Sequence, residues 1–339
     1  MSGRKPGRKA RRKSKRPSSA ALARPITQSP AQGGHPGAGR TPGQLPELLC
    51  GRYKIERLLG VGGMGAVYRA RDLLREVHGE PAAHVALKTL SSEFAEHPDA
   101  NSLLHSEFAL TSRLHHPNIV RACHFDLDPA SQQAFFTLEL LKGSTLDQLL
   151  DAYPSGLPWV QAREIALPLI DALIHAHAHD VLHGDIKPGN ILLCEQGPIL
   201  FDFGLAQLDE SARAGLPQLN RQRFTALTPR YAAPELHQHA PLTAASETFA
   251  VACVLFELSC GRHPLGNRDT PERLADLRPL ARLPRRAARC LGAALDSQPQ
   301  KRPSLEELSD AFRKSSRKVG LGGLFRHWAR TRRHDANRS

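Results

Sequence analysis

One ten-residue segment, His183–Leu192, carries three side chains whose types and spacing suit phosphoryl transfer. That reaction needs a group to receive the proton of an acceptor hydroxyl, a cation beside the transferred phosphate, and a ligand for a metal ion. Asp185, Lys187 and Asn190 could supply one function each. A single short match is only a hypothesis. It becomes an argument if the other parts of such a site follow in the right order along the chain.

A glycine-rich segment, Gly60–Gly65, fits the spacing GxGxxG. Dinucleotide-binding turns share this spacing, but they require a helix directly after the glycines. Here Ala66, Val67 and Tyr68 continue as a strand. The segment therefore favours a hairpin whose glycines let backbone N–H groups approach phosphates closely, rather than a dinucleotide site or a merely flexible turn.

A lysine and a glutamate follow the hairpin. Lys88 ends the strand-like run Val85–Lys88, and Glu107 lies in the helical pattern that comes next. A lysine that faces phosphates needs a carboxylate to orient it. Either residue alone would be an ordinary surface charge, but together with the hairpin they predict a site for nucleotide phosphates.

Periodicity predicts the elements that position these groups. The strands are expected at 53–59, 66–71, 83–90, 119–127 and 134–141, with one helix at 102–114. Further helices are expected at 145–152, 158–179, 247–260, 271–277, 285–295 and 304–312. The fold class is therefore α+β, with a small antiparallel-sheet lobe (about 50–141) and a larger helical lobe (about 142–312) in one domain, 50–312. No internal repeat is present.

The charge of the chain is concentrated in two tails. Residues 1–50 hold eleven Lys/Arg and one acid, and residues 313–339 hold nine and one, whereas residues 51–312 hold 26 basic and 31 acidic residues. This distribution argues against a nucleic-acid-binding domain. The tails, 1–49 and 313–339, are expected to be solvated and disordered. They could instead attach to an acidic partner, nucleic acid or anionic lipid.

Other features exclude several classes of protein. The six cysteines are scattered without metal-ligand spacing, which is typical of reduced thiols in the cytoplasm. No apolar segment follows the N-terminal basic residues as it would in a secretory signal. The longest apolar run, Phe249–Phe256, is too short to span a membrane. His175, His177 and His179 could bind zinc only with a further ligand, so packing or surface placement is favoured.

These motifs resemble those of eukaryotic-type (Hanks-type) serine/threonine protein kinases, and the Gly62–Tyr68 loop is similar to that of bacterial members. Asp202-Phe203-Gly204 matches the family's DFG motif. Ala233-Pro234-Glu235 matches its APE motif, and Arg302 stands where the arginine that pairs with that glutamate is placed. The resemblance covers about residues 52–312. It implies transfer of the ATP γ-phosphoryl group to Ser and Thr hydroxyls of proteins, including autophosphorylation, with Mg²⁺ or alternatively Mn²⁺.

The resemblance also implies residue roles. Asp185 would be the catalytic base, Lys187 would stabilise the transferring phosphate, and Asn190 and Asp202 would bind the metal. Thr228 would be the substrate-loop threonine, and Glu235 and Arg302 would pair. The implied ATP-binding residues are Gly60, Val61, Gly62, Gly63, Met64, Gly65, Val67, Ala86, Lys88, Glu107, Glu139 and Leu141. Among these the Glu139 carbonyl and Leu141 N–H would contact adenine beside a gatekeeper, Leu138, although simple core packing also explains such apolar strand residues.

Several positions depart from the family pattern. Gly184 replaces the arginine that commonly receives an activation-loop phosphate, which makes the chain a non-RD type. Phosphorylation of Ser211, Thr225 or Thr228 would then lack its usual docking site, so activation is expected to depend little on it. Leu227 and Ala252 replace glycines, and Glu247 replaces the aspartate that anchors the catalytic loop. These changes put the tightness of the loop's support in question.

Two other interpretations stay open at this stage. His-Gly-Asp followed by Asn190 is also a signature of kinase-like small-molecule phosphotransferases, but those families usually lack Lys187, the Phe-Gly after the metal aspartate and the APE–arginine pair. The second alternative is a pseudokinase scaffold recruited through its tails. Lys88, Glu107, Asp185, Asn190 and Asp202 are all intact, however, so the sequence shows no lesion in the catalytic set.

Overall fold

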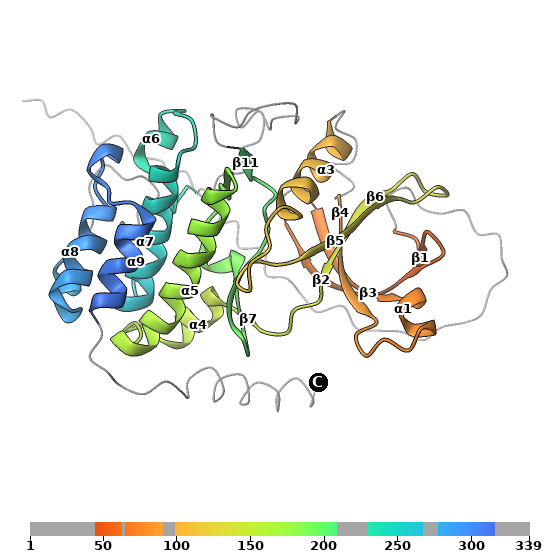
Figure 1. Cartoon of the computed structure of the whole chain (residues 1–339), viewed down its shortest axis with the longest axis horizontal. Helices are drawn as coiled ribbons and strands as arrows, with labels where there is room; N and C mark the ends of the chain where they lie inside the picture. Colours follow the sequence, from red (N-terminus) through yellow and green to blue (C-terminus); the bar gives the residue numbers. More distant parts are fainter. Residues whose placement is uncertain (1–44, 63–64, 91–98, 209–228, 267–276, 316–339) are drawn as a thin grey trace, which may run out of the picture. The chain divides into compact units, whose positions relative to one another are not determined.

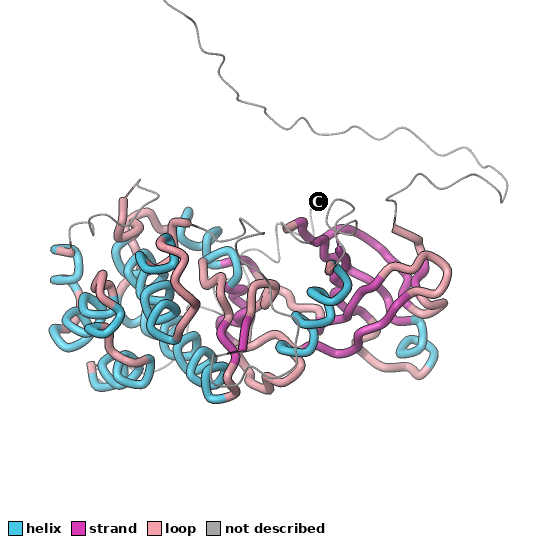
Figure 2. Tube along the Cα trace, turned by 90° about the horizontal axis from the view of Figure 1, so that it is seen from above, coloured by secondary structure: helices cyan, strands magenta, loops and turns pink. Residues whose placement is uncertain are grey.

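The computed structural model describes residues 45–62, 65–90, 99–208, 229–266 and 277–315, all within one compact unit. The strands of the larger sheet and the long helices of the second half gather in separate parts of this unit (Figures 1 and 2). The expected α+β class, with a sheet lobe followed by a helical lobe, is confirmed.

The first lobe is a six-stranded antiparallel sheet with the strand order β1-β2-β3-β4-β6-β5. Its strands are β1 (Leu48–Leu49), β2 (Tyr53–Val61), β3 (Gly65–Asp72), β4 (His84–Leu90), β5 (Ala122–Leu127) and β6 (Ala134–Glu139). A short helix, α1 (Leu73–Val77), follows β3 at once, because the Asp72 side chain accepts hydrogen bonds from its first backbone N–H groups.

The alternation of side chains along β4 decides which residues face the helix of this lobe, α3 (Ala100–Thr111). Val85 and Leu87 pack with Tyr53 and Phe135 in one core cluster. Leu90 packs in another cluster, with Ala100 and Leu104 of α3. Lys88 has the parity of Leu90, so its side chain extends toward α3. The sheet therefore places Lys88 at its interface with α3, where Glu107 lies.

The second lobe is built on helices. They are α4 (Leu146–Ala152), α5 (Trp159–Ala178), α6 (Pro234–His237), α7 (Ala244–Cys260), α8 (Arg285–Ala294) and α9 (Leu305–Lys314). Short 3₁₀ turns lie at Pro188–Asn190, Arg278–Arg282 and Pro299–Lys301, and short strands at Ser144–Thr145 (β7), Val181–Leu182 (β8), Ile191–Cys194 (β9), Gly197–Leu200 (β10) and Gln207–Leu208 (β11).

Helix α7 lies in the core of this lobe. The whole run Phe249–Phe256 is buried there, which explains its apolar sequence without a membrane. The helix begins with a capping box between Thr243 and Ser246 and ends at Gly261, whose φ of +69° suits glycine. Among the described residues, no helix combines the length and apolar character needed to cross a membrane.

The elements differ from the sequence expectation mainly at their ends. Strand β1 lies before residue 50, the expected start of the domain, and pairs with β2. Helix α9 continues past residue 312 to Lys314. Strand β5 begins at Ala122 rather than at 119. The expected helix at 271–277 falls almost wholly outside the described residues. Two-residue strands such as β1 have no periodicity of their own, because tertiary pairing alone creates them.

Candidate active site

Lys88 joins two carboxylates from different parts of the chain. Its Nζ donates to Glu107 Oε1 at 2.5 Å and to Asp202 Oδ1 at 2.6 Å. The lysine side chain is 10% exposed and that of Glu107 is 7% exposed, so both charges depend on this pairing. Burial alone would lower the pKa of Lys88, but the charges of Asp202 and Glu107 outweigh it and raise that pKa. The predicted lysine–glutamate pair is therefore present and extends to the DFG aspartate.

Asp202 carries a positive φ of +65°. This left-handed conformation is uncommon for a residue with a side chain and signals local backbone strain. The Lys88 ammonium is the main cause of a lowered pKa at Asp202, so its carboxylate is ionised near neutral pH. An ionised carboxylate of this kind is the donor that Mg²⁺ prefers.

The catalytic loop brings Asp185, Lys187 and Asn190 together. Asp185 Oδ2 accepts from Lys187 Nζ at 2.6 Å and from Asn190 Nδ2 at 3.0 Å. Asn190 Nδ2 also donates to the Asp185 carbonyl at 2.9 Å, across the 3₁₀ turn Pro188–Asn190. Because the amide nitrogen of Asn190 makes both of these bonds, its amide oxygen is the atom that suits a hard metal ion. The residue types of Asn190 and Asp202 thus fit Mg²⁺.

His183 supports this loop from inside. Its ring is fully buried, its Nε2 donates to the Phe201 carbonyl at 3.1 Å, and its Nδ1 accepts from the Asp185 N–H at 3.2 Å. Both ring nitrogens therefore have hydrogen-bond partners within the fold. His183 is thus a structural residue that links the loop of Asp185 to the strand leading to Asp202.

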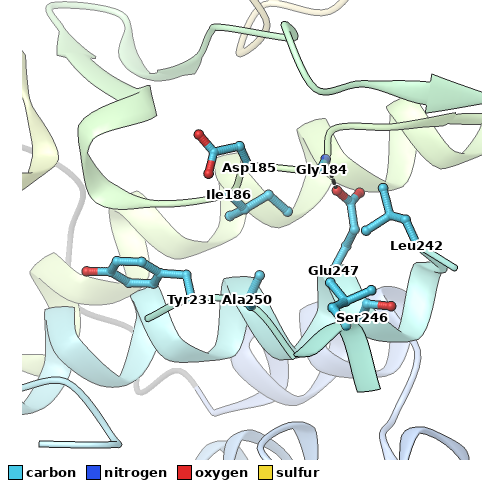
Figure 3. Close-up of a pocket in the computed structure, with 10 residues that line it drawn as sticks. Gly184, Asp185, Ile186, Tyr231, Leu242, Ser246, Glu247 and Ala250 are labelled. Atoms are coloured by element: carbon cyan, nitrogen blue, oxygen red, sulfur yellow. Dashed lines mark hydrogen bonds between the residues drawn. The ribbon is translucent and has the colours of Figure 1, made fainter. Parts of the chain in front are cut away.

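A buried glutamate holds the loop from the opposite side. The Gly184 N–H donates to Glu247 Oε1 at 2.6 Å (Figure 3). On the other side of the carboxylate, His177 Nε2 donates to Glu247 Oε2 at 2.8 Å. Burial would raise the pKa of Glu247, but these bonds and the charge of His177 hold it below its ordinary value. Glu247 therefore takes the anchoring position, despite being one methylene longer than the expected aspartate. The sequence favoured packing or surface placement for His177, because its helical spacing could not show that it binds Glu247 of α7.

A pocket lies beside this anchor. Gly184, Asp185 and Ile186 of the catalytic loop line one side, and Ser246, Glu247 and Ala250 of α7 line the other (Figure 3). Tyr231, Ala232, Leu236 and Leu242 complete the lining. Most of these side chains are apolar, and the Asp185 carboxylate points away from the side chains of α7 (Figure 3).

The glycine-rich segment forms the expected hairpin. Gly60 lies opposite Val67 and Val61 opposite Ala66, and the Gly62 N–H donates to the Gly65 carbonyl at 2.8 Å. A Cβ on Gly65 would come within 2.2 Å of the Thr89 carbonyl oxygen, so the neighbouring strand requires glycine there. Gly63 and Met64 lie outside the described residues, as do Ser211, Thr225, Leu227 and Thr228.

Two of the residues expected to lie beside adenine, Val67 and Ala86, are on the paired strands β3 and β4. Val67 lies opposite Lys88, and Ala86 lies opposite Leu138. Leu138 and Leu141 also pack against a small core cluster of Val120, Cys194 and Ile199, which joins the sheet to β9 and β10. These contacts fit core packing, and contact of the segment with adenine stays a prediction.

Glu235 and Arg302 pair as the resemblance implied. Arg302 Nη1 and Nη2 donate to the two carboxylate oxygens of Glu235 at 2.7 and 2.8 Å. The arginine side chain is fully buried, and further bonds to the Asp296, Ala245 and Ser297 carbonyls satisfy its other donors. This bidentate pair ties the start of α6 to the turn before α9.

A second buried contact near α6 was not anticipated. The Tyr231 hydroxyl donates to Glu257 Oε2 of α7 at 2.6 Å, and the ring packs edge-on against His263. Burial, together with the Glu257 charge, raises the pKa of Tyr231. The contact joins residues far apart in sequence, so no local pattern could have revealed it.

Three histidines, His116, His175 and His179, form a stacked group. The rings of His175 and His179 have centroids 4.3 Å apart, and His116 stacks on His175 at 5.2 Å. Within the described ranges, no group of three or more His, Cys, Asp or Glu side chains is arranged to hold a metal ion.

Comparison with known proteins agrees with this geometry. The family model described as "Protein kinase domain" matches residues 53–312. The DNA damage-responsive serine/threonine-protein kinase RqkA of Deinococcus radiodurans is 35% identical over 68% of this chain and 32% of its own length. Serine/threonine-protein kinase PkaA of Streptomyces coelicolor is 33% identical over 80% of this chain and 51% of its own. The chain thus spans a third to a half of these relatives.

A solved structure agrees as well. The kinase domain of PknI from Mycobacterium tuberculosis superposes with a TM-score of 0.60 at 26% identity, covering 82% of this chain and 100% of that domain. The match of the family model to most of the chain, together with the lysine–glutamate–aspartate contact and the catalytic loop described above, shows that the chain belongs to the Hanks-type serine/threonine protein kinase family.

Proposed function

We propose that this chain transfers the γ-phosphoryl group of ATP to serine and threonine hydroxyls of proteins, itself included. The single observation that carries the proposal is the double contact of Lys88 with Glu107 and Asp202. It links the sheet, α3 and the metal-binding segment. Protein kinases as a family use ATP and Mg²⁺, and phosphoryl transfer depends mainly on such positioning and on charge stabilisation.

Each side chain then takes a defined role. Lys88, braced by Glu107, would hold the α- and β-phosphates, and the backbone N–H groups of Gly60–Gly65 would enclose the phosphates. Asp202 and Asn190 would hold Mg²⁺, which neutralises phosphate charge when bound; Mn²⁺ is an alternative. The Glu139 carbonyl and the Leu141 N–H would contact adenine, with Val67 and Ala86 above the ring.

The acceptor hydroxyl would meet the catalytic loop. Asp185 would orient it and receive its proton, and Lys187 would stabilise the transferring phosphate. The 2.6 Å contact between the two supports this assignment, since it already places a cation beside the carboxylate. Thr228, the substrate-loop threonine, would contact the acceptor segment.

Protein substrates are favoured over small amines. The buried Glu235–Arg302 pair braces the segment that precedes α6, a feature that small-molecule phosphotransferases usually lack. A scaffold without catalysis is disfavoured, because every charged group needed for the reaction is present and paired as an active site requires.

Activation is proposed to depend little on loop phosphorylation, as in non-RD kinases. Gly184 offers no guanidinium to a phosphate, and Glu247 and His177 hold the loop through its backbone instead. The proposed kinase domain covers about residues 50–312, preceded by β1 and flanked by the basic tails at 1–49 and 313–339. Binding of those tails to acidic partners, nucleic acid or anionic lipid stays a prediction.

The test is incubation of the wild type and an Asp185→Asn variant with ATP and Mg²⁺, followed by mapping of phosphosites by mass spectrometry. We expect phosphoserine and phosphothreonine in the wild type and background signal in the variant. Equal labelling of both proteins, or phosphorylation of small amines only, would contradict the proposal.

A further inference from the structure

Helix α8 carries a concentrated positive charge on its exposed side. Arg282, just before the helix, and Arg285, Arg286 and Arg289 within it are all exposed; we call these four the α8 arginine cluster. The opposite side of α8 is buried through Ala287, Leu291 and Ala294. The helix, labelled in Figure 1, is therefore fixed to the core while its arginines face solvent.

No acidic residue lies within the segment that carries these arginines. Residues 277–295 contain no acid, and within the described part of the chain none of the four arginines forms an ion pair. Arg285 and Arg286 lie in the first turn, where the helix dipole disfavours cations. Arg285 and Arg289 are neighbours at i,i+4, as are Arg286 and Arg289 at i,i+3, and like charges at these spacings repel. The cluster thus costs stability, which an external anion would restore.

The acidic residues around the cluster favour one kind of anion over others. Helix α9 packs against α8 and exposes Glu306 and Glu307, and Asp310 of α9 lies close enough to Arg286 for their charges to interact. Residues 51–312 as a whole contain more acidic than basic residues. A long polyanion or a membrane surface would meet this negative surround, whereas a short acidic peptide segment would contact only the arginines.

We propose that the α8 arginine cluster is a docking surface for a short Asp/Glu-rich segment of protein substrates. The inference rests on the proposed kinase function and adds a substrate class to it. None of the four arginines belongs to the active site, so the cluster would act on substrate affinity rather than on the chemical step. Its contribution should weaken as salt rises, because the contacts are exposed.

The experiment uses two peptides that copy the strongest autophosphorylation site of the chain. One carries a glutamate tract and the other an equal glutamine tract, each joined by a flexible Gly/Ser linker of about 20 residues, which spans about 25 Å. An Arg285→Gln/Arg289→Gln variant is compared with a matched control, Lys54→Gln/Arg113→Gln, which removes two exposed charges elsewhere. Fluorescence anisotropy of the labelled glutamate peptide, duplex DNA and phosphatidylserine vesicles measures binding directly.

We expect the glutamate tract to lower KM about five- to tenfold in the wild type and in the control, with kcat unchanged. The cluster variant should lose this advantage, as should the wild type when salt rises from about 0.05 M to about 0.5 M. Equal KM values for the two peptides in the wild type, or an unchanged advantage in the cluster variant, would overturn the proposal. So would cluster-dependent binding of DNA or vesicles without binding of the peptide. Turnover of the glutamine peptide reports catalysis separately, so its absence would instead refute the kinase function.

Discussion

The Glu247 carboxylate accepts a hydrogen bond of 2.6 Å from the Gly184 main-chain N–H, although 63 residues separate the two in sequence. Because the donor is a backbone N–H, the side chain at position 184 plays no part in the contact. The other oxygen of Glu247 is occupied by His177. One buried carboxylate therefore supports the catalytic loop from the side of α7.

Replacement of Glu247 by alanine should weaken both stability and catalysis. The Gly184 N–H and the His177 ring, both partly buried, would be left without an acceptor, at a cost of up to about 3 kcal/mol each. A displaced loop should lower kcat by about 100-fold. Urea denaturation and steady-state kinetics measure the two effects. Glu247→Gln keeps an acceptor for Gly184 and should be milder. Wild-type kcat in the alanine variant would show that the loop needs no such anchor.

The same carboxylate predicts a pH dependence of stability. The pKa of Glu247 is lowered in the folded state, so the unfolded chain binds more protons near that pKa. The contribution of Glu247 is therefore complete above its ordinary pKa and is lost as the pH falls through the lowered value. Denaturation of wild type and Glu247→Gln between pH 7 and pH 3, at about one-unit steps, should show the smaller pH slope in the variant. Identical slopes would contradict the lowered pKa.

Gly184→Arg should destabilise the protein. The residue has a φ of +83°, a conformation that costs other residues about 1–2 kcal/mol. The free energy of unfolding should fall by that amount in both Gly184→Arg and Gly184→Ala, since strain and not charge is the cause. Thermal denaturation of the pair provides the check. An arginine variant as stable as the wild type, with the alanine variant destabilised, would point to a gained interaction instead.

Phosphatase treatment should leave most of the kinase activity intact. Gly184, not an arginine, precedes Asp185, and Glu247 holds the catalytic loop through its backbone. Initial rates on a peptide substrate before and after treatment, with removal of phosphate verified by mass spectrometry, test this expectation. A loss of about tenfold or more on treatment would show a phosphate switch.

Arg302→Met should destabilise the helical lobe strongly. It would leave Glu235 without its buried partner, which typically costs about 3–5 kcal/mol. Arg302→Lys keeps the charge but loses the two parallel bonds, so an intermediate loss is expected. The midpoint and slope of urea unfolding distinguish the variants, and a neutral effect of the methionine substitution would show that the pair is dispensable.

The sequence predicted the local parts of the molecule well. The alternation in Val85–Leu90 and the spacing after Ser102 were enough to place Lys88 on a strand and Glu107 on the next helix, and both elements form. The glycine hairpin was likewise predictable, because Ala66 and Val67 favour a strand over a helix. These patterns depend on neighbours close in sequence.

Contacts between distant segments could not be predicted from the sequence where no family motif covers them. His175, His177 and His179 look alike on one helix, and only the packing of α5 against α7 selects His177 as the partner of Glu247. The Tyr231–Glu257 bond and the two-residue strand β1 have the same origin. Tertiary packing creates these contacts, so the periodicity of the sequence does not predict them.

Helix α7 has a mechanical consequence for the site. Glu247 near its start binds the catalytic loop, and Glu257 near its end binds Tyr231, about 15 Å further along the axis at 1.5 Å per residue. Most residues of α7 are buried, so the surrounding core holds this helix in place along its length. The segment of Tyr231 and the catalytic loop are therefore both bound to α7. A shift of this helix would move both together and preserve their spacing.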